Sequence, residues 1–155
     1  MSENEKFDEL SKKAEQGDVK AQVEIGDMYY FGKGVEQDYK KAFEWYTNAA
    51  ERGDASAQYN LGGMYDNGQG VEQDYEFAVE WYTKAAEQEN VSAQNNLGVM
   101  YANGQGVERD YEKAVEWCTK AAEQGDAFAQ YHLGLMYANG QGVEQDCNKA
   151  IEWYT

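Results

Sequence analysis

The amino-acid sequence predicts an all-α fold, an α-solenoid built from repeated helix pairs, and three recurring patterns carry this prediction. The string Tyr-x-x-Gly-x-Gly-Val-Glu occurs four times, beginning at Tyr29, Tyr65, Tyr101 and Tyr137. An Ala-Gln pair begins at Ala21, Ala57, Ala93 and Ala129. Tryptophan recurs at Trp45, Trp81, Trp117 and Trp153. The step in each pattern is 36 residues, and a fixed period of this length is typical of stacked helical repeats.

The repeat period divides nearly the whole chain. With Val19 as the starting point, residues 19–54, 55–90 and 91–126 form three complete repeats, and residues 127–155 form a fourth that is incomplete at its C-terminus. Residues 1–18 resemble an isolated second helix of a repeat, because Phe7 matches Phe43 and Ala14 matches Ala50. We expect one continuous solenoid domain, since each repeat buries its apolar face against its neighbours.

The first helix of each repeat, which we call helix A, has clear start and stop signals. Its N-cap candidates are Asp18, Asp54, Asn90 and Asp126, whose side chains can accept from the first-turn N–H groups. Apolar and small residues then follow helical spacing. Glycines inside the helix, such as Gly26, suggest a closely approaching neighbour. Helix A is expected to end at the Gly32-Lys33-Gly34 turn. This turn lacks the Lys-Ser or Lys-Thr and the third glycine of phosphate-binding loops.

The second helix, helix B, is expected to begin after Asp38, Asp74, Asp110 and Asp146. In the first repeat its stripe contains Ala42, Trp45, Tyr46, Ala49 and Ala50, which lie on one face of a helix. The recurring tryptophans are therefore predicted to fill the junction between helices. Gly53 and Gly125 close two of the helices, whereas Glu89 stands at the same place between them. We expect that junction to be capped differently.

These residues resemble the Sel1-like repeat family, a relative of the tetratricopeptide repeats, over residues 14 to 155. The resemblance rests on Ile25-Gly26, Met28-Tyr29, the Gly32-x-Gly34-Val35 turn and Trp45-Tyr46 with their later copies. It implies a right-handed α-solenoid of antiparallel helix pairs, with the A helices lining the concave side. It also implies adaptor roles in signalling, in complex assembly and, in bacteria, in host contact. The paired cysteines of a secreted, disulfide-stapled branch of the family are missing here.

Composition excludes several classes of partner. The chain of 155 residues has 29 acidic and 13 basic residues and a formal charge of −16. Such a surface repels nucleic-acid phosphates and anionic membranes. The charge either keeps an aromatic-rich protein soluble, or attracts a basic protein or mimics nucleic acid. The N-terminus has no apolar leader and no run long enough to span a membrane, so a cytoplasmic location is expected.

Few residues are suited to catalysis. His132 is the only histidine, and neither a nucleophilic triad nor a zinc motif accompanies it. We predict no enzymatic activity, no metal and no cofactor. Cys118 and Cys147 are expected to be free thiols, because their registers on neighbouring B helices differ by two turns, roughly 10 Å, whereas a disulfide needs Cα atoms within about 7 Å.

The positions of helix A that vary between repeats form one stripe beside the core stripe. We predict that this stripe binds a protein or peptide, although a merely solvated face is the alternative. The predicted binding residues are Lys20, Val23, Glu24, Asp27, Tyr59, Asn60, Asn95, Asn96, Val99, Phe128, Tyr131, His132 and Leu135. Charged residues on the A helices sum to only −2, so we expect a nearly neutral groove rich in Asn and Tyr.

A competing prediction is that the acidic helix B face and turns capture a basic protein or mimic nucleic acid. The sequence stops at Thr155, about two turns into the last helix B. A solenoid end without a polar capping helix exposes the surface meant for the next repeat. We therefore expect either a longer repeat array or an end-to-end homodimer, with Leu135, Tyr137, Ile151 and Tyr154 near the open surface.

Overall fold

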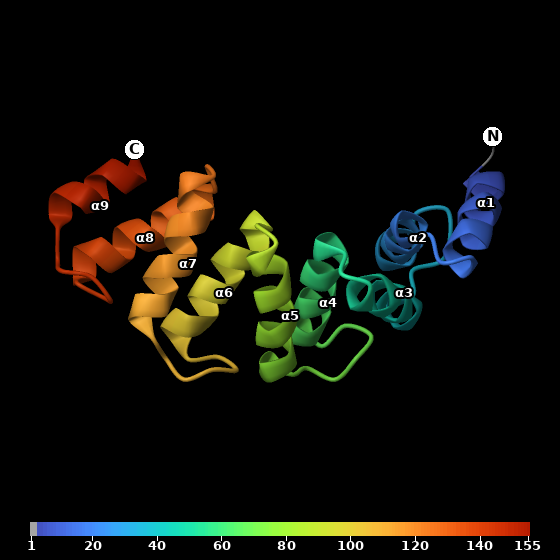
Figure 1. The fold of residues 1–155 in the computed structure, drawn as a ribbon, viewed down its shortest axis with the longest axis horizontal. Coiled ribbons are helices and arrows are strands. Elements are labelled where there is room, and N and C mark those ends of the chain that lie inside the picture. Colours follow the sequence, from blue (N-terminus) through green and yellow to red (C-terminus); the bar gives the residue numbers. More distant parts are fainter. Residues whose placement is uncertain (1–2) are drawn as a thin grey trace. The chain divides into compact units, whose positions relative to one another are not determined.

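The computed structural model describes residues 3–155, and every regular element in that range is an α-helix. The chain divides into two compact units, one ending at Asp74 and the other running from Tyr75 to Thr155. The first unit contains α1 (Glu3–Glu15), α2 (Val19–Phe31), α3 (Tyr39–Glu51) and α4 (Ala55–Asn67). The second contains α5 (Tyr75–Glu87), α6 (Val91–Asn103), α7 (Tyr111–Glu123), α8 (Ala127–Asn139) and α9 (Cys147–Tyr154). The all-α repeat prediction is confirmed (Figure 1).

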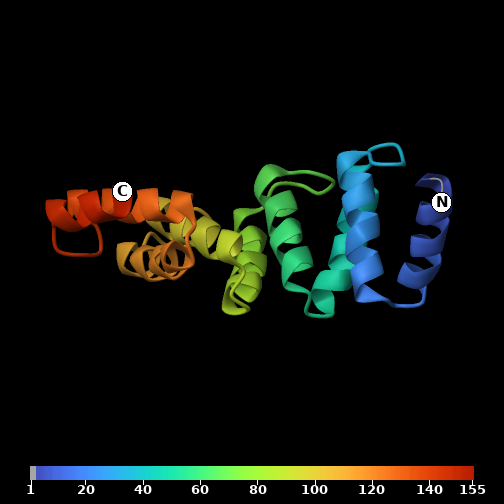
Figure 2. The ribbon, with the colours of Figure 1, turned by 90° about the horizontal axis from the view of Figure 1, so that it is seen from above.

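Within each unit, consecutive helices pack against each other. In the first unit α1 contacts α2, α2 contacts α3, and α3 contacts α4, and Figure 2 shows α1 and α2 as neighbouring rods joined by a short turn. In the second unit α5 to α9 contact in the same order, and α6 also contacts α8. This last contact brings A helices of consecutive repeats together.

The predicted helix A caps are confirmed. The Asp18 carboxylate accepts from the Ala21 amide at 3.0 Å, and Asp54, Asn90 and Asp126 do the same for their own helices. Each helix A ends at the first glycine of the Gly-x-Gly turn, which has left-handed backbone angles. The second glycine has another role that the repeat pattern does not reveal. A Cβ at Gly106 would collide with the Tyr75 carbonyl at the start of α5, so this turn packs directly on the preceding helix B.

The junction after α5 corrects one expectation. Glu89 does not change the capping geometry: it adopts a left-handed φ of 64°, like Gly125 (φ 89°) at the same place after α7. The backbone of this turn is fixed by the packing of α5 against α6 on either side of it. The repeat therefore imposes its turn geometry on a residue that is poorly suited to it.

The recurring Ala-Gln pairs connect each helix A to the preceding helix B. The Gln94 side chain donates to the Ala86 carbonyl at 3.2 Å, and Gln22, Gln58 and Gln130 make the equivalent bond in their own repeats. The accepting carbonyl belongs to the last turn of helix B, and it also accepts from a backbone amide of the following turn, as Ala86 does from Glu89. Each glutamine thus adds a second hydrogen bond to a carbonyl at the helix end and ties the next helix to it.

The core also corrects the role predicted for tryptophan. The large side chains that are almost fully buried on helix B are Tyr46 and Tyr82, one residue beyond each tryptophan. The four tryptophans are only half-buried. The Lys84 ammonium lies 4.1 Å from the centre of the Trp81 ring, so this ring borders solvent and contributes through its covered face and a cation–π contact. Alanines such as Ala78, Ala85 and Ala86 complete the buried stripe.

Cys118 is buried, Cys147 is exposed and both are free thiols, as predicted. No helix among residues 3–155 is long and apolar enough to cross a membrane.

Candidate functional site

The predicted helix A stripe has residues in both units, and they differ in how far solvent reaches them. In the first unit Lys20 and Glu24 are exposed, and Val23, Tyr59 and Asn60 are half-buried. Asp27 is not available as a solvated charge, because its carboxylate accepts the Tyr46 hydroxyl at 2.6 Å. Burial, followed by this hydrogen bond, raises the pKa of Tyr46. The bond fixes α3 against α2.

In the second unit the structure brings predicted residues of α6 and α8 together. The Nδ1 atom of His132 lies 3.1 Å from the Asn95 amide oxygen. Since that oxygen only accepts, the pairing places the imidazole proton on Nδ1 and leaves Nε2 as an acceptor. Burial lowers the pKa of His132, which favours the neutral ring. Asn95 itself is only 9% exposed, and it acts by orienting His132 rather than as an open contact residue.

Two aromatic side chains of α8 point to solvent. Phe128 is 72% exposed and Tyr131 is 54% exposed. The centre of the Tyr131 ring lies 6.1 Å from the centre of the Tyr154 ring on α9. Asn96, the remaining stripe residue of α6, is half-buried. Aromatic side chains are enriched in protein–protein interfaces relative to the rest of the surface.

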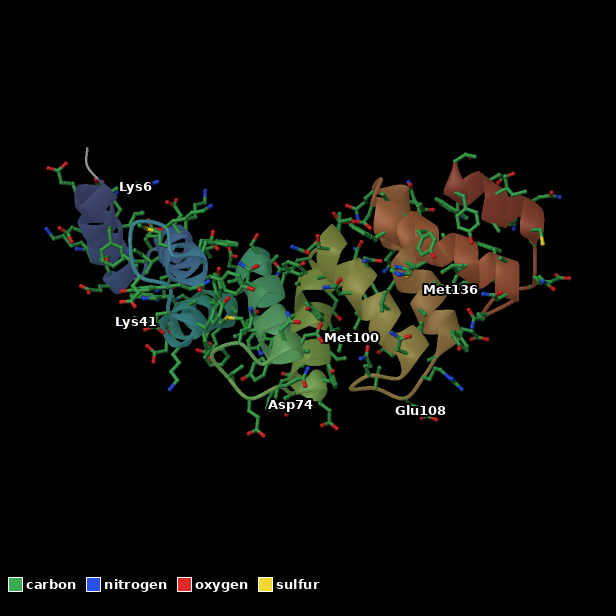
Figure 3. All side chains as sticks on the ribbon, turned by 180° about the vertical axis from the view of Figure 1, so that it is seen from behind. Lys6, Lys41, Asp74, Met100, Glu108 and Met136 are labelled. Atoms are coloured by element: carbon green, nitrogen blue, oxygen red, sulfur yellow. The ribbon has the colours of Figure 1, made fainter. Side chains whose placement is uncertain are left out.

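A cavity of about 220 Å³ lies in the second unit among α6, α7 and α8 and the turn that follows α8. Three predicted stripe residues line it: Val99, His132 and Leu135. Met136 of α8, labelled in Figure 3, belongs to both this wall and the core. The remaining walls are Gly98, Ala102, Asn103, Tyr111, Cys118 and Gln141.

Sequence reasoning missed the cavity, although one signal for it is present. Cys118 stands at the position where the second helices of the other three repeats carry tyrosine. Replacement of a phenol ring by a thiol can leave an empty space. Burial raises the pKa of the Cys118 thiol to about 12, which disfavours the reactive thiolate at neutral pH. Among the described residues, no group of three or more His, Cys, Asp and Glu side chains could hold a metal ion. The arrangement therefore offers shape, aromatic surface and hydrogen-bonding groups.

Comparison with protein-family models finds Sel1 repeats at residues 19–54, 55–90, 91–126 and 127–155. No curated protein matches the chain.

Solved structures share this repeat fold. A protective antigen of uropathogenic Escherichia coli strains, displaying an SLR fold, is 46% identical with a TM-score of 0.93, over 96% of this chain and 32% of the antigen. A Sel1 repeat protein from Oxalobacter formigenes is 38% identical with a TM-score of 0.86, over 96% of this chain and 67% of that protein. Helicobacter pylori cysteine rich protein B is 28% identical with a TM-score of 0.62, over 79% of this chain and 93% of that protein. The chain thus spans about a third of the length of the antigen.

Proposed function

This chain belongs to the Sel1 repeat family, and on that premise we propose that it is a non-enzymatic scaffold that binds a protein or peptide segment on its helix A face. Sel1 repeat proteins are generally protein-interaction scaffolds. The stripe was identified because its residues vary between the repeats of this chain. Those of its residues that face solvent are not required for packing between the helices.

The exposure of Phe128 and Tyr131 on α8 is the observation that carries this proposal. Both are large aromatic groups left in water at 72% and 54% exposure. A chain with a formal charge of −16 has many polar residues with which to cover such positions. Tyrosine and phenylalanine supply rigid contact area at low entropic cost, which is what central contacts of interfaces require.

Quantitative affinity capture tests the proposal. The purified protein is immobilised, and proteins retained from the source-cell lysate are quantified for the wild type and for a Phe128→Ser, Tyr131→Ser variant. The matched control is Phe31→Ser, which removes another aromatic group, 57% exposed, from the turn-side end of α2. All three proteins are first compared by circular dichroism for equal helicity.

The expected result is a partner that wild type and the Phe31 variant retain equally and the double variant loses. Retention of every partner by the double variant would contradict binding at this face. Equal loss of the partner by both variants would contradict the proposal as well, because it would indicate nonspecific hydrophobic binding.

The exposed end of α9 supports a related proposal about assembly. Ile151 is 58% exposed and Tyr154 is 47% exposed, and apolar surface of this kind is suited to a neighbouring repeat or a second copy of the chain. We expect an end-to-end homodimer of the isolated chain. Size exclusion with light scattering over a hundredfold concentration range should show it, and an Ile151→Lys variant should be monomeric. A wild-type monomer at every concentration would contradict this assembly.

A further inference from the structure

The cavity in the second unit occupies a place that side chains fill in the first repeat. Residues 72 positions apart are equivalent in repeats 1 and 3. By this register Cys118 corresponds to Tyr46, Ala102 to Tyr30 and Val99 to Asp27. The three replacements remove two phenol rings and one carboxylate from the same location.

In the first repeat both rings are packed and hydrogen-bonded. Their centroids lie 6.3 Å apart. The Tyr46 ring lies against Gly26, where an added Cβ would be only 2.6 Å from a ring carbon. The Tyr46 hydroxyl donates to Asp27, and the Tyr30 hydroxyl donates to the Gln69 side-chain oxygen at 2.8 Å. The fold can therefore hold phenol groups at this location.

In the third repeat the surroundings of the rings are kept but the rings are missing. Gly98 stands where Gly26 does, and Gln141 stands where Gln69 does. Both line the cavity of about 220 Å³, and Cys118, 0% exposed, forms its floor. An apolar cavity of about 150 Å³ is already large enough to bind benzene, so this volume is sufficient for one substituted ring.

The polar groups on the wall suit a hydroxyl-bearing ring. Gln141 supplies an amide at the place where Gln69 accepts a phenol. His132 also lines the cavity, and its pairing with Asn95 leaves Nε2 as an acceptor. Val99, Leu135 and Met136 provide the apolar remainder.

We propose that this cavity is a receptor for one tyrosine side chain of a bound protein partner, whose phenol ring occupies the space left by the tyrosines that repeat 3 lacks. The identification rests on the proposed protein-binding function, because a partner must present the ring. The cavity is separate from Phe128 and Tyr131, which do not line it. The two proposals can therefore fail independently.

Two probes test the cavity without any partner: p-cresol, which is the tyrosine side chain alone, and N-acetyltyrosinamide. Each is titrated into the ¹⁵N-labelled full chain and followed by NMR. We expect saturable shifts centred on Val99, His132 and Leu135 for both probes, and weaker binding of toluene, which lacks the hydroxyl. No saturable shift with p-cresol would overturn the inference. Binding of p-cresol without N-acetyltyrosinamide would also overturn it, since a backbone-linked ring would then not fit.

Two variants should block the cavity in different ways. Cys118→Phe restores a ring beside Gly98 without an unpaired hydroxyl, and Ala102→Tyr restores the equivalent of Tyr30 opposite Gln141. Each should abolish the shifts caused by p-cresol. Ala138→Tyr is the matched control, because it adds the same ring in the same register one repeat later, outside the cavity wall. Unchanged p-cresol binding in the folded Ala102→Tyr variant would overturn the inference even if Cys118→Phe fails to fold.

Discussion

The turn after α5 holds a glutamate in a conformation suited to glycine, so Glu89→Gly is expected to stabilise the protein. Glu89 has φ 64°, within the left-handed region. For a residue with a Cβ this conformation costs roughly 1–2 kcal/mol. Glycine removes that cost, but it also raises the conformational entropy of the unfolded chain, which lowers the free energy of unfolding by about 0.4–1 kcal/mol. With the middle of each range, the free energy of unfolding should therefore rise by roughly 0.8 kcal/mol.

Urea denaturation followed by circular dichroism measures this change, and a thermal melt should rise by about 1–4 °C for a chain of this size. Glu89→Gln is the control for charge, because an acidic group near a helix C-terminus is itself mildly unfavourable. The mirror variant is Gly125→Glu, where an added Cβ meets nothing within 4 Å. The free energy of unfolding of this variant should fall by a similar amount, because only the backbone conformation becomes unfavourable. If Glu89→Gln gained as much as Glu89→Gly, or if Gly125→Glu cost nothing, the conformational explanation would be refuted.

Three other predictions concern how far particular side chains are buried. Gln94→Ala should lower the free energy of unfolding by about 0.5–1.5 kcal/mol, the usual net contribution of one lost hydrogen bond, because the Ala86 carbonyl keeps its bond from the Glu89 amide; an unchanged urea midpoint would contradict this. Titration with a thiol reagent at neutral pH should detect only Cys147 in the native protein and both cysteines after denaturation, whereas two reactive native thiols would contradict the burial of Cys118. Trp81→Ala should cost less than the ~3–5 kcal/mol typical of buried large aromatics, and a melt showing a loss within that range would refute its half-buried placement.

The fold was predictable because local signals agree with the repeat. Asp18 and its copies fit an N-cap, and Gly32 and its copies fit a left-handed C-cap, so both helix boundaries could be placed from residue type alone. The regular period then indicated that consecutive helices pack against each other. Periodicity could not fix the rotation of helix B about its axis, since Trp45 and Tyr46 are adjacent and both fit an apolar stripe. The structure buries Tyr46 and leaves Trp45 half-buried.

The candidate site was less predictable, because it depends on differences between repeats rather than on the repeat itself. The stripe positions were identified by their variability, but the bond from Tyr46 to Asp27 and the pairing of Asn95 with His132 join residues distant in sequence. The cavity, in turn, arises because Cys118 and Ala102 are smaller than the tyrosines at the equivalent positions of the first repeat. A loss of side-chain volume shows its effect only when the surrounding helices are in place.

The salt dependence of partner binding tests the central claim, a nearly neutral helix A binding face, most directly. The dissociation constant of the captured partner is measured by titration calorimetry at about 50 mM and about 500 mM salt, between which the screening length falls roughly threefold. Binding through the aromatic and amide groups of the stripe predicts a change of less than about threefold, because few charges take part. Weakening by a factor of a hundred or more would contradict it and would favour capture of a basic partner by the acidic surface.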